Sequence, residues 1–112
     1  MGKMKQFKPI MEVQFLLTLS DGRSKGFMEI ARIMHVQLSP TTQMFVKKIA
    51  KPLSKRGLIK STWGGYQITD AGLAWLQREG LELVVKQFGY PDETIEYLAQ
   101  DPLGELRRMF DM

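Results

Sequence analysis

Apolar residues recur at helical spacing near the start of the chain, and turn-forming residues separate the stretches. A first helix is predicted over residues 9–19, starting at a proline, with four apolar side chains on one stripe that faces a core. These side chains are Ile10, Val13, Leu16 and Leu17. A turn at 20–22 and a brief extended piece at 23–26 lead to a short second helix over 27–34.

The third helix has the clearest start signal. Ser39-Pro40 pairs a residue that can cap the first turn with one whose missing N–H suits the first helical position. The helix is expected to continue through Ala50. Pro52 predicts a local break followed by one further turn, because it removes a backbone donor. Gly57 supplies the left-handed residue that closes helices.

Two short strands, 58–62 and 66–68, flank Gly64-Gly65. Glycines between β-forming residues predict a hairpin. Thr69 can then cap a fourth helix, which runs to about Phe88.

The net charge of the chain changes from positive to negative beyond residue 90. Two short helices are expected there, over 92–99 and 103–110. Residues 91–112 hold six acids against two arginines, whereas residues 1–90 hold 14 Lys and Arg against six acids. We therefore predict a main domain over 1–90 and an acidic C-terminal extension over 91–112, which serves in dimerisation or packing.

The basic residues are concentrated in one interval. No acid occurs between Glu29 and Asp70, and seven basic residues lie there: Arg32, Lys47, Lys48, Lys51, Lys55, Arg56 and Lys60. A surface that only keeps a protein soluble usually mixes charges of both signs. The interval therefore favours a polyanion as partner.

The predicted elements follow the order helix, short helix, capped helix, hairpin, long helix. This order is typical of a winged helix-turn-helix. We therefore predict an α+β fold, mainly α, with a small sheet of two or three strands and extra C-terminal helices. The 112 residues suffice for one domain with a modest core.

Local sequence supports this interpretation. Lys55-Arg56-Gly57-Leu58-Ile59, preceded by Leu53, resembles the recognition-helix end and first wing strand of winged-helix transcription regulators. Tyr66-Gln67-Ile68-Thr69 with Gly72 resembles the second strand and helix start of MarR-type and PadR-type regulators. The resemblance covers about residues 27–76 and implies a DNA-binding fold.

A second likeness is partial. Ser61 and Gly64-Gly65-Tyr66 resemble the iron–sulfur-sensing repressors of the IscR group. The chain lacks the cysteines that hold the cluster in that group, so that sensing mechanism does not carry over. Its wing is also a few residues shorter, and Pro52 stands where those regulators have an ordinary helix former.

A helical wheel divides the third helix into two arcs. The core arc is expected to hold Thr42, Phe45, Val46, Ile49, Ala50 and Leu53. The opposite arc holds Thr41, Gln43, Met44, Lys47, Lys48, Lys51 and Lys55. We predict that Thr41 and Gln43 reach base edges in a major groove, that Met44 touches a thymine methyl group and that the lysines contact phosphates.

Three residues complete the predicted DNA-binding set. Arg56 and Lys60 flank the start of the hairpin, and Trp63 lies at its tip. Trp63 has two interpretations. Its ring either contacts the sugar–phosphate backbone or minor groove, or folds back over the hairpin to cover apolar surface.

The fourth and later helices carry the predicted dimer interface. Trp75 projects from the polar face of the fourth helix, where a large aromatic side chain is expected to be covered. The cover is either a second subunit or the C-terminal helices of the same chain. The interface residues expected for a homodimer are Trp75, Tyr97, Leu98, Leu106 and Phe110.

Several classes of function are not expected. The absence of cysteine excludes disulfides and thiolate metal sites, and the single histidine, His35, cannot assemble a triad or typical zinc site. We predict no enzyme, no metal and no cofactor. The uncharged apolar stretch 13–20 is too short to span a bilayer, so we expect a cytoplasmic protein.

The function expected from the sequence is binding of double-stranded DNA by a dimeric transcriptional repressor. The rival is a winged helix used as a protein-interaction module, because a fold does not fix a function. The acidic extension can also dock on a basic partner or on the basic face of this chain.

Overall fold

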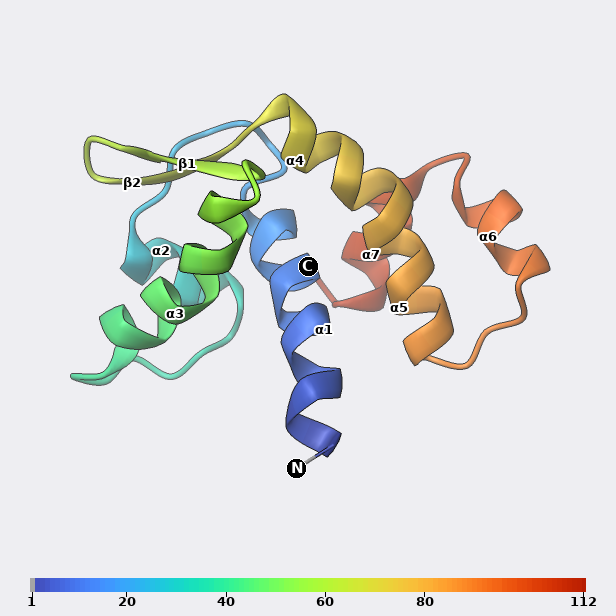
Figure 1. Cartoon of the computed structure of the whole chain (residues 1–112), viewed down its shortest axis with the longest axis horizontal. Coiled ribbons are helices and arrows are strands. Elements are labelled where there is room, and N and C mark those ends of the chain that lie inside the picture. Colours follow the sequence, from blue (N-terminus) through green and yellow to red (C-terminus); the bar gives the residue numbers. More distant parts are fainter. Residues whose placement is uncertain (1) are drawn as a thin grey trace.

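The computed structural model describes the backbone of residues 2–112 and the side chains of residues 8–112. Within these residues the chain is mainly helical with one small antiparallel sheet (Figure 1), which confirms the predicted α+β, mainly α class. The elements are α1 (Gly2–Thr18), α2 (Phe27–Ile33), α3 (Thr42–Lys55), β1 (Ile59–Thr62), β2 (Gly65–Ile68), α4 (Asp70–Trp75), a π-helical turn η1 (Leu76–Gly80), α5 (Leu81–Gln87), α6 (Glu93–Leu98) and α7 (Pro102–Met109).

Helix α1 runs through the middle of the molecule between α3 and α5 (Figure 1). The prediction that it starts at Pro9 is wrong, because the helix begins at Gly2 and contains this proline. A proline inside a helix removes one backbone donor without forcing the chain to stop. The predicted stripe is too narrow as well, since Phe15, Leu19 and even Glu12 are buried.

The bounds of helix α2 agree with the prediction to within one residue, and His35 ends the helix. This residue has a φ of 60°, and the N–H of Val36 donates to the carbonyl of Ala31 at 2.8 Å. Histidine is one of the few residues other than glycine that enter the left-handed region with some frequency. His35 thus ends one helix and turns the chain toward the next.

Helix α3 begins at Thr42, two residues later than predicted. The residues from Ser39 form a preceding turn, in which the N–H of Ser39 donates to Thr42 Oγ1 at 2.7 Å and the N–H of Thr42 donates to the carbonyl of Ser39 at 3.1 Å. The prediction of a local break at Pro52 is wrong too, because the helix is continuous to Lys55. Gly57, at a φ of 74°, closes it as predicted.

The sheet consists of β1 and β2, paired antiparallel with Ile59 opposite Ile68 and Thr62 opposite Gly65. The extended piece predicted before α2 supplies one further bridge. Lys25 and Tyr66 exchange both backbone hydrogen bonds at 2.9 Å. The side chain of Lys25 is buried and pairs with Asp21, with 2.6 Å between Nζ and Oδ1.

The predicted fourth helix contains an interruption that the sequence analysis missed. Thr69 caps α4 as predicted, accepting from the N–H of Gly72 at 3.0 Å. The helix then widens into η1 before it continues as α5, and helical backbone angles persist at both junctions. A π-helical turn inserts one residue into a helix, so it shifts the buried face of everything that follows.

Helices α6 and α7 pack against the same core as the rest of the chain. They lie within two residues of the predicted bounds, and Asp101 caps α7 by accepting from the N–H of Gly104 at 3.3 Å. The fully buried large side chains of the core are Phe15, Leu16, Leu19, Ile30, Leu53, Leu76, Leu81, Leu106, Val13, Val46, Val84 and Val85. Among the described residues, no helix has the length and apolar character needed to cross a membrane.

Candidate nucleic-acid interface

A row of polar and basic side chains runs along the solvent side of α3. Gln43, Lys47, Lys51 and Lys55 are all exposed and are spaced four residues apart, which puts neighbours about one turn apart on the same side of a helix. The opposite side supplies the buried residues of α3, namely Thr42, Val46, Ile49, Ala50 and Leu53. Five of the six residues predicted for the core arc are therefore buried, and Phe45 is half-buried.

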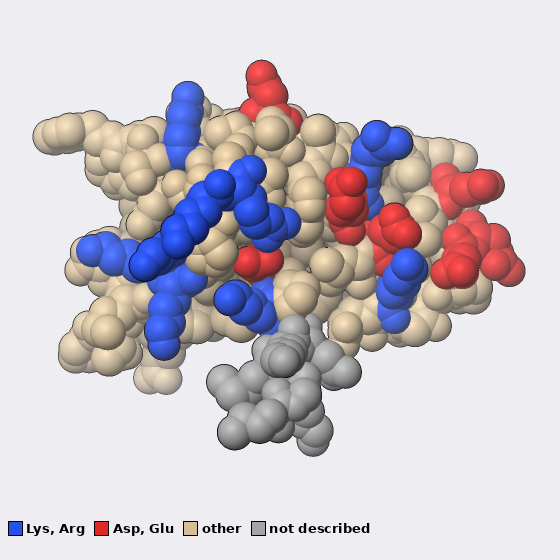
Figure 2. Space-filling model, in the orientation of Figure 1, with Lys and Arg blue, Asp and Glu red and all other residues tan. Residues whose placement is uncertain are grey.

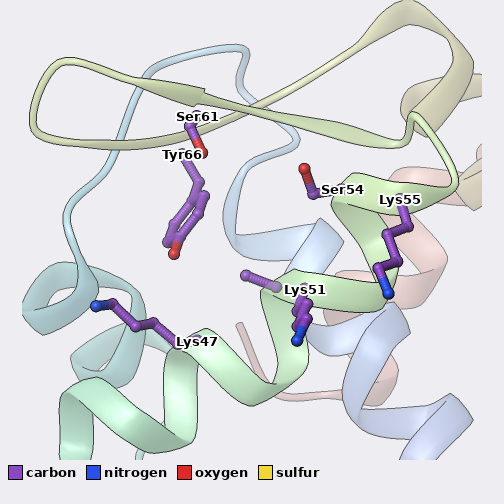
Figure 3. A pocket seen from close by; sticks show the side chains of 7 residues that line it. Lys47, Lys51, Ser54, Lys55, Ser61 and Tyr66 are labelled. Carbon is purple, nitrogen blue, oxygen red and sulfur yellow. The ribbon is translucent and has the colours of Figure 1, made fainter.

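The row borders a hollow of about 380 Å³ between α3 and the hairpin. Its α3 side is formed by Lys47, Ala50, Lys51, Ser54 and Lys55, and its hairpin side by Ser61 and Tyr66. In Figure 3 Ser61 and Tyr66 extend from the hairpin toward α3, and the lysines follow the helix below them. The hollow therefore combines ammonium groups with hydroxyl groups that donate and accept hydrogen bonds.

A second hollow of about 400 Å³ continues the first toward the tip of the hairpin. It shares Lys47, Ser61 and Tyr66 with the first and adds Gln43 from α3 and Phe27 from α2. We call the two hollows together the α3–hairpin groove. The groove runs from the end of α3 to its first turn, so the predicted phosphate contacts Lys47, Lys51 and Lys55 share one surface with the predicted base contact Gln43.

The electrostatics of the molecule are divided between its two ends. Lys and Arg gather over the part that holds α3, and Asp and Glu over the part that holds α6 (Figure 2). Among the residues that the structure describes, none of those lining the α3–hairpin groove is acidic. Their ammonium groups therefore act together on any anion in the groove.

The hairpin is held in place by two contacts of strand β2, one to helix α1 and one to the turn that follows α1. The ring of Tyr66 meets that of Phe15 edge to face, with 6.1 Å between centroids, and Phe15 itself is fully buried in α1. Gln67 Nε2 donates to the carbonyl of Gly22 at 2.6 Å. These contacts hold the two walls of the groove in a defined arrangement.

Trp63 lies at the tip, in the two-residue turn that joins β1 and β2. Its relative exposure is 103%, so its ring covers no part of the protein. The alternative in which it folds back over the hairpin is therefore wrong. Thr41, Met44 and Lys48 are exposed on or beside α3, outside the residues that line the groove.

Arg56 and Lys60 are placed apart from the groove. Arg56 Nη1 pairs with Glu12 Oε1 at 3.1 Å, and its guanidinium carbon lies 5.0 Å from the centroid of the Trp75 ring. This arginine thus ties α3 to α1 and α4. Lys60 lines a different hollow, together with Asp21 and Gln67, because successive residues of a strand point to opposite faces.

The residues predicted for a dimer interface separate into two kinds. Leu98 and Leu106 are buried within the chain, and Trp75 and Phe110 are half-buried against the same core. Tyr97, by contrast, is 70% exposed on α6. Within the chain, Trp75 is partly covered by the core and by the guanidinium group of Arg56.

The sequence analysis missed three hydroxyl-bearing residues of the first hollow as site residues: Ser54, Ser61 and Tyr66. Ser61 lies opposite Tyr66 in the register, two residues from the buried pair Ile59 and Ile68. The period of two in a strand therefore puts Ser61 and Tyr66 on the inner face of the hairpin. Applied to the predicted hairpin, this periodicity identifies both residues.

One ionisable group next to the hairpin has an altered pKa. Partial burial opposes ionisation of Asp21, but hydrogen bonds from the Lys25 ammonium and the Arg23 N–H, with both positive charges nearby, lower the pKa of its carboxyl overall. The pair secures the segment that bridges to β2. Across the side chains of residues 8–112, no three His, Asp or Glu residues come together as metal ligands.

No protein-family model matches the chain, and no curated protein or solved structure is significantly similar to it.

Proposed function

We propose that this chain is a winged helix-turn-helix domain that binds double-stranded DNA. The observation that carries the proposal is the row Gln43, Lys47, Lys51 and Lys55, exposed along the α3–hairpin groove. Three ammonium groups in line on one helix can contact successive phosphates of a duplex, and the amide of Gln43 at the start of the row can bind base edges.

The order of the elements supports the same proposal. Helices α1 and α2, the helix α3 and the hairpin β1–β2 follow one another as in winged-helix domains, and the isolated Lys25–Tyr66 bridge lies where such domains have a short third strand. In this proposal α3 is the recognition helix and the hairpin is the wing. This step is an analogy of fold, so the charge row carries more weight than the topology.

Each predicted contact has a role in the proposed complex. Thr41, Gln43 and Met44, at the first turn of α3, approach base edges in the major groove. Lys47, Lys48, Lys51 and Lys55 bind phosphates and fix the register of the protein on the duplex. Ser61 and Tyr66 extend the phosphate contacts from the hairpin side of the groove.

The proposed biological role is transcriptional repression in the cytoplasm by occupation of an operator. A homodimer doubles the contact with a palindromic site, because two-fold symmetry in the protein matches two-fold symmetry in the DNA. Tyr97 on α6 is the exposed member of the predicted interface and is the residue that we propose for it.

Binding to a duplex at two salt concentrations tests the proposal. We expect affinity to fall steeply with salt, because each phosphate contact releases a counterion. Lys47→Glu/Lys51→Glu is expected to abolish binding. The matched control is Arg78→Glu/Lys86→Glu, which makes the same change in net charge at exposed positions of η1 and α5. Equal losses in the two variants, or no binding by the folded native protein, would refute DNA binding through α3.

A protein-interaction module is the second candidate, and one observation favours it. Met44 is 68% exposed beside the basic row, and Met28 and Trp63 are exposed as well. Exposed apolar side chains are typical of protein interfaces. This candidate predicts a partner whose binding survives Lys47→Glu/Lys51→Glu but is lost in Met28→Ala/Met44→Ala, as measured by pull-down and calorimetry.

A further inference from the structure

Trp63 is the most exposed large apolar side chain among the described residues. The other tryptophan, Trp75, is half-buried and lies against Arg56. An indole ring presents a large apolar surface, and leaving it in water forgoes the stabilisation that burial provides. A ligand that covers the exposed ring of Trp63 would therefore gain this stabilisation.

The support beneath this ring is stiff. One residue before it, the hydroxyl of Thr62 is hydrogen-bonded to that of Ser24. Two residues after it, the backbone of Gly65 passes so close to Lys25 that an added Cβ would lie 2.0 Å from the carbonyl oxygen of that lysine. Tyr66 is then held by two backbone hydrogen bonds to Lys25. The backbone of the turn is thus fixed on both sides, so a ligand that binds the ring has to order only the side chain of Trp63.

The space beside the ring is open. Gly64 follows Trp63 at a φ of 105°, and nothing lies within 4 Å of the position that its Cβ would take. A glycine next to an aromatic ring leaves room for a flat partner to slide alongside it. Gln43 and Lys47 line the adjoining part of the α3–hairpin groove, so a ligand that reaches the ring meets polar and cationic groups as well.

We propose that Trp63 stacks on a nucleobase that is displaced from the helical stack. The ligand class is DNA that contains an unpaired or weakly stacked base, such as a mismatch, a bubble or a junction between duplex and single strand. Base-on-aromatic stacking stabilises a complex without reading sequence, because every base has a flat face. The apolar wedges of many DNA-bending proteins open base steps in the same way.

This inference rests on the proposed function, since the phosphates must first be held along α3. A protein partner with an apolar pocket could accommodate the ring of Trp63 considered by itself. It suits the cationic groove less well, because closing such a pocket over the tip strips water from Lys47. A base linked to phosphates can stack on the ring of Trp63 while its phosphates bind the cationic groove.

The test compares two duplexes of one sequence, one fully paired and one with a short central bubble that contains 2-aminopurine. The native protein is expected to bind the bubble about tenfold more tightly, because stacking of one base on an aromatic ring adds to the affinity. It is also expected to quench the fluorescence of the 2-aminopurine through stacking. Trp63→Ala should abolish both effects, and Trp63→Phe should retain part of each. Because Trp63 touches nothing, these variants keep the native melting temperature.

Leu38→Ala is the matched control, since it removes another exposed apolar side chain, one that lies outside the proposed DNA-binding residues. It should leave the ratio between the two affinities unchanged. A bubble preference that persists in Trp63→Ala, or salt-dependent binding without any preference, would overturn the stacking role and leave the proposed function intact. If the native protein binds neither duplex at low salt, both proposals fall.

Discussion

At the scale of single residues, Gly65 shows how closely the hairpin approaches the segment before α2. Its missing side chain lets the backbone of β2 pass the carbonyl of Lys25, where a Cβ would lie at 2.0 Å. Backbone atoms cannot rotate away as a side chain can, so any other residue forces the two segments apart.

We expect Gly65→Ala to lower the free energy of unfolding by about 1–3 kcal/mol, because the hairpin must shift to relieve the clash. Urea denaturation measures the loss. Gly64→Ala is the control, since the space around Gly64 is open and only its positive φ is strained, at about 1 kcal/mol. Equal losses in the two variants would show that the close approach contributes nothing.

Asp21 and Lys25 form the ion pair that holds the bridging segment. The lysine side chain is 4% exposed and the aspartate 47%, so removal of the carboxylate leaves an ammonium group buried without its partner. Asp21→Asn is expected to cost about 1 kcal/mol, because water screens the exposed half of the pair.

The pH dependence of this effect has a defined sign. The pKa of Asp21 is lower in the folded chain than its ordinary value of 3.8, so the carboxylate stabilises the fold above that value. This contribution is lost as the pH falls through the folded pKa. The difference in melting temperature between native protein and Asp21→Asn should therefore be constant near neutral pH and shrink below about pH 4. A difference that is independent of pH down to pH 2 would contradict it.

At the residue scale, the sequence predicted which side chains are exposed better than it predicted which residues they contact. The exposure of Lys47, Lys51 and Lys55 follows from helical periodicity alone. Arg56 belongs to the same basic stretch but pairs with Glu12, 44 residues away. Local spacing carries no information about such a pair, so its role could not be predicted.

At the scale of elements, one side chain joins two helix ends. The hydroxyl of Thr69 accepts from the N–H of Gly72 at 3.0 Å at the start of α4. It also donates to the carbonyl of Gly57 at 2.6 Å, just beyond the end of α3. A single hydroxyl group thus satisfies an unpaired donor of one helix and an acceptor near the end of another.

Thr69→Ala is expected to destabilise the chain by about 2 kcal/mol, near the upper end for loss of an N-cap, because both hydrogen bonds disappear. Thr69→Ser is the matched control, as it keeps the hydroxyl and should cost far less. Thermal denaturation of the two variants checks the expectation. Equal destabilisation by serine and alanine would assign the effect to the methyl group instead.

The elements themselves were largely predictable, and the failures share one cause. Helix closure at Gly57 and the cap at Thr69 are local and were confirmed. Pro9 and Pro52 were expected to start or break helices, yet both lie inside them. Packing of the surrounding helix on the core outweighs one missing backbone hydrogen bond. The π-helical turn η1 likewise depends on packing and has no local signal.

At the scale of the whole molecule, the C-terminal helices complete the core instead of extending from it. Leu106 is fully buried with residues from α1 and η1, whereas Tyr97 on α6 faces solvent. The sequence placed both in one predicted interface, because periodicity within a short helix cannot tell burial in the same chain from burial against a second one.

Because Leu106 is buried and Tyr97 is exposed, alanine substitutions at these two positions should have different effects on stability. Leu106→Ala is expected to lower the free energy of unfolding by about 2–5 kcal/mol through the cavity that it leaves. Tyr97→Ala should leave stability unchanged, within about 0.5 kcal/mol, because an exposed side chain loses few contacts. In sedimentation experiments Tyr97→Ala should weaken self-association if the proposed dimer forms through α6. A dimer unaffected by Tyr97→Ala excludes this residue from the interface.

The separation of charge along the molecule gives it the properties of an electric dipole. In the field of a polyanion such a particle rotates before contact and arrives with its α3 end foremost. The field decays over about 30 Å at 0.01 M salt but about 8 Å at 0.15 M. The longest dimension of the molecule is 41 Å. At low ionic strength both ends therefore sense the approaching polyanion and the torque is large, whereas near physiological salt only the nearer end does, and the molecule orients in the last few ångströms of its approach.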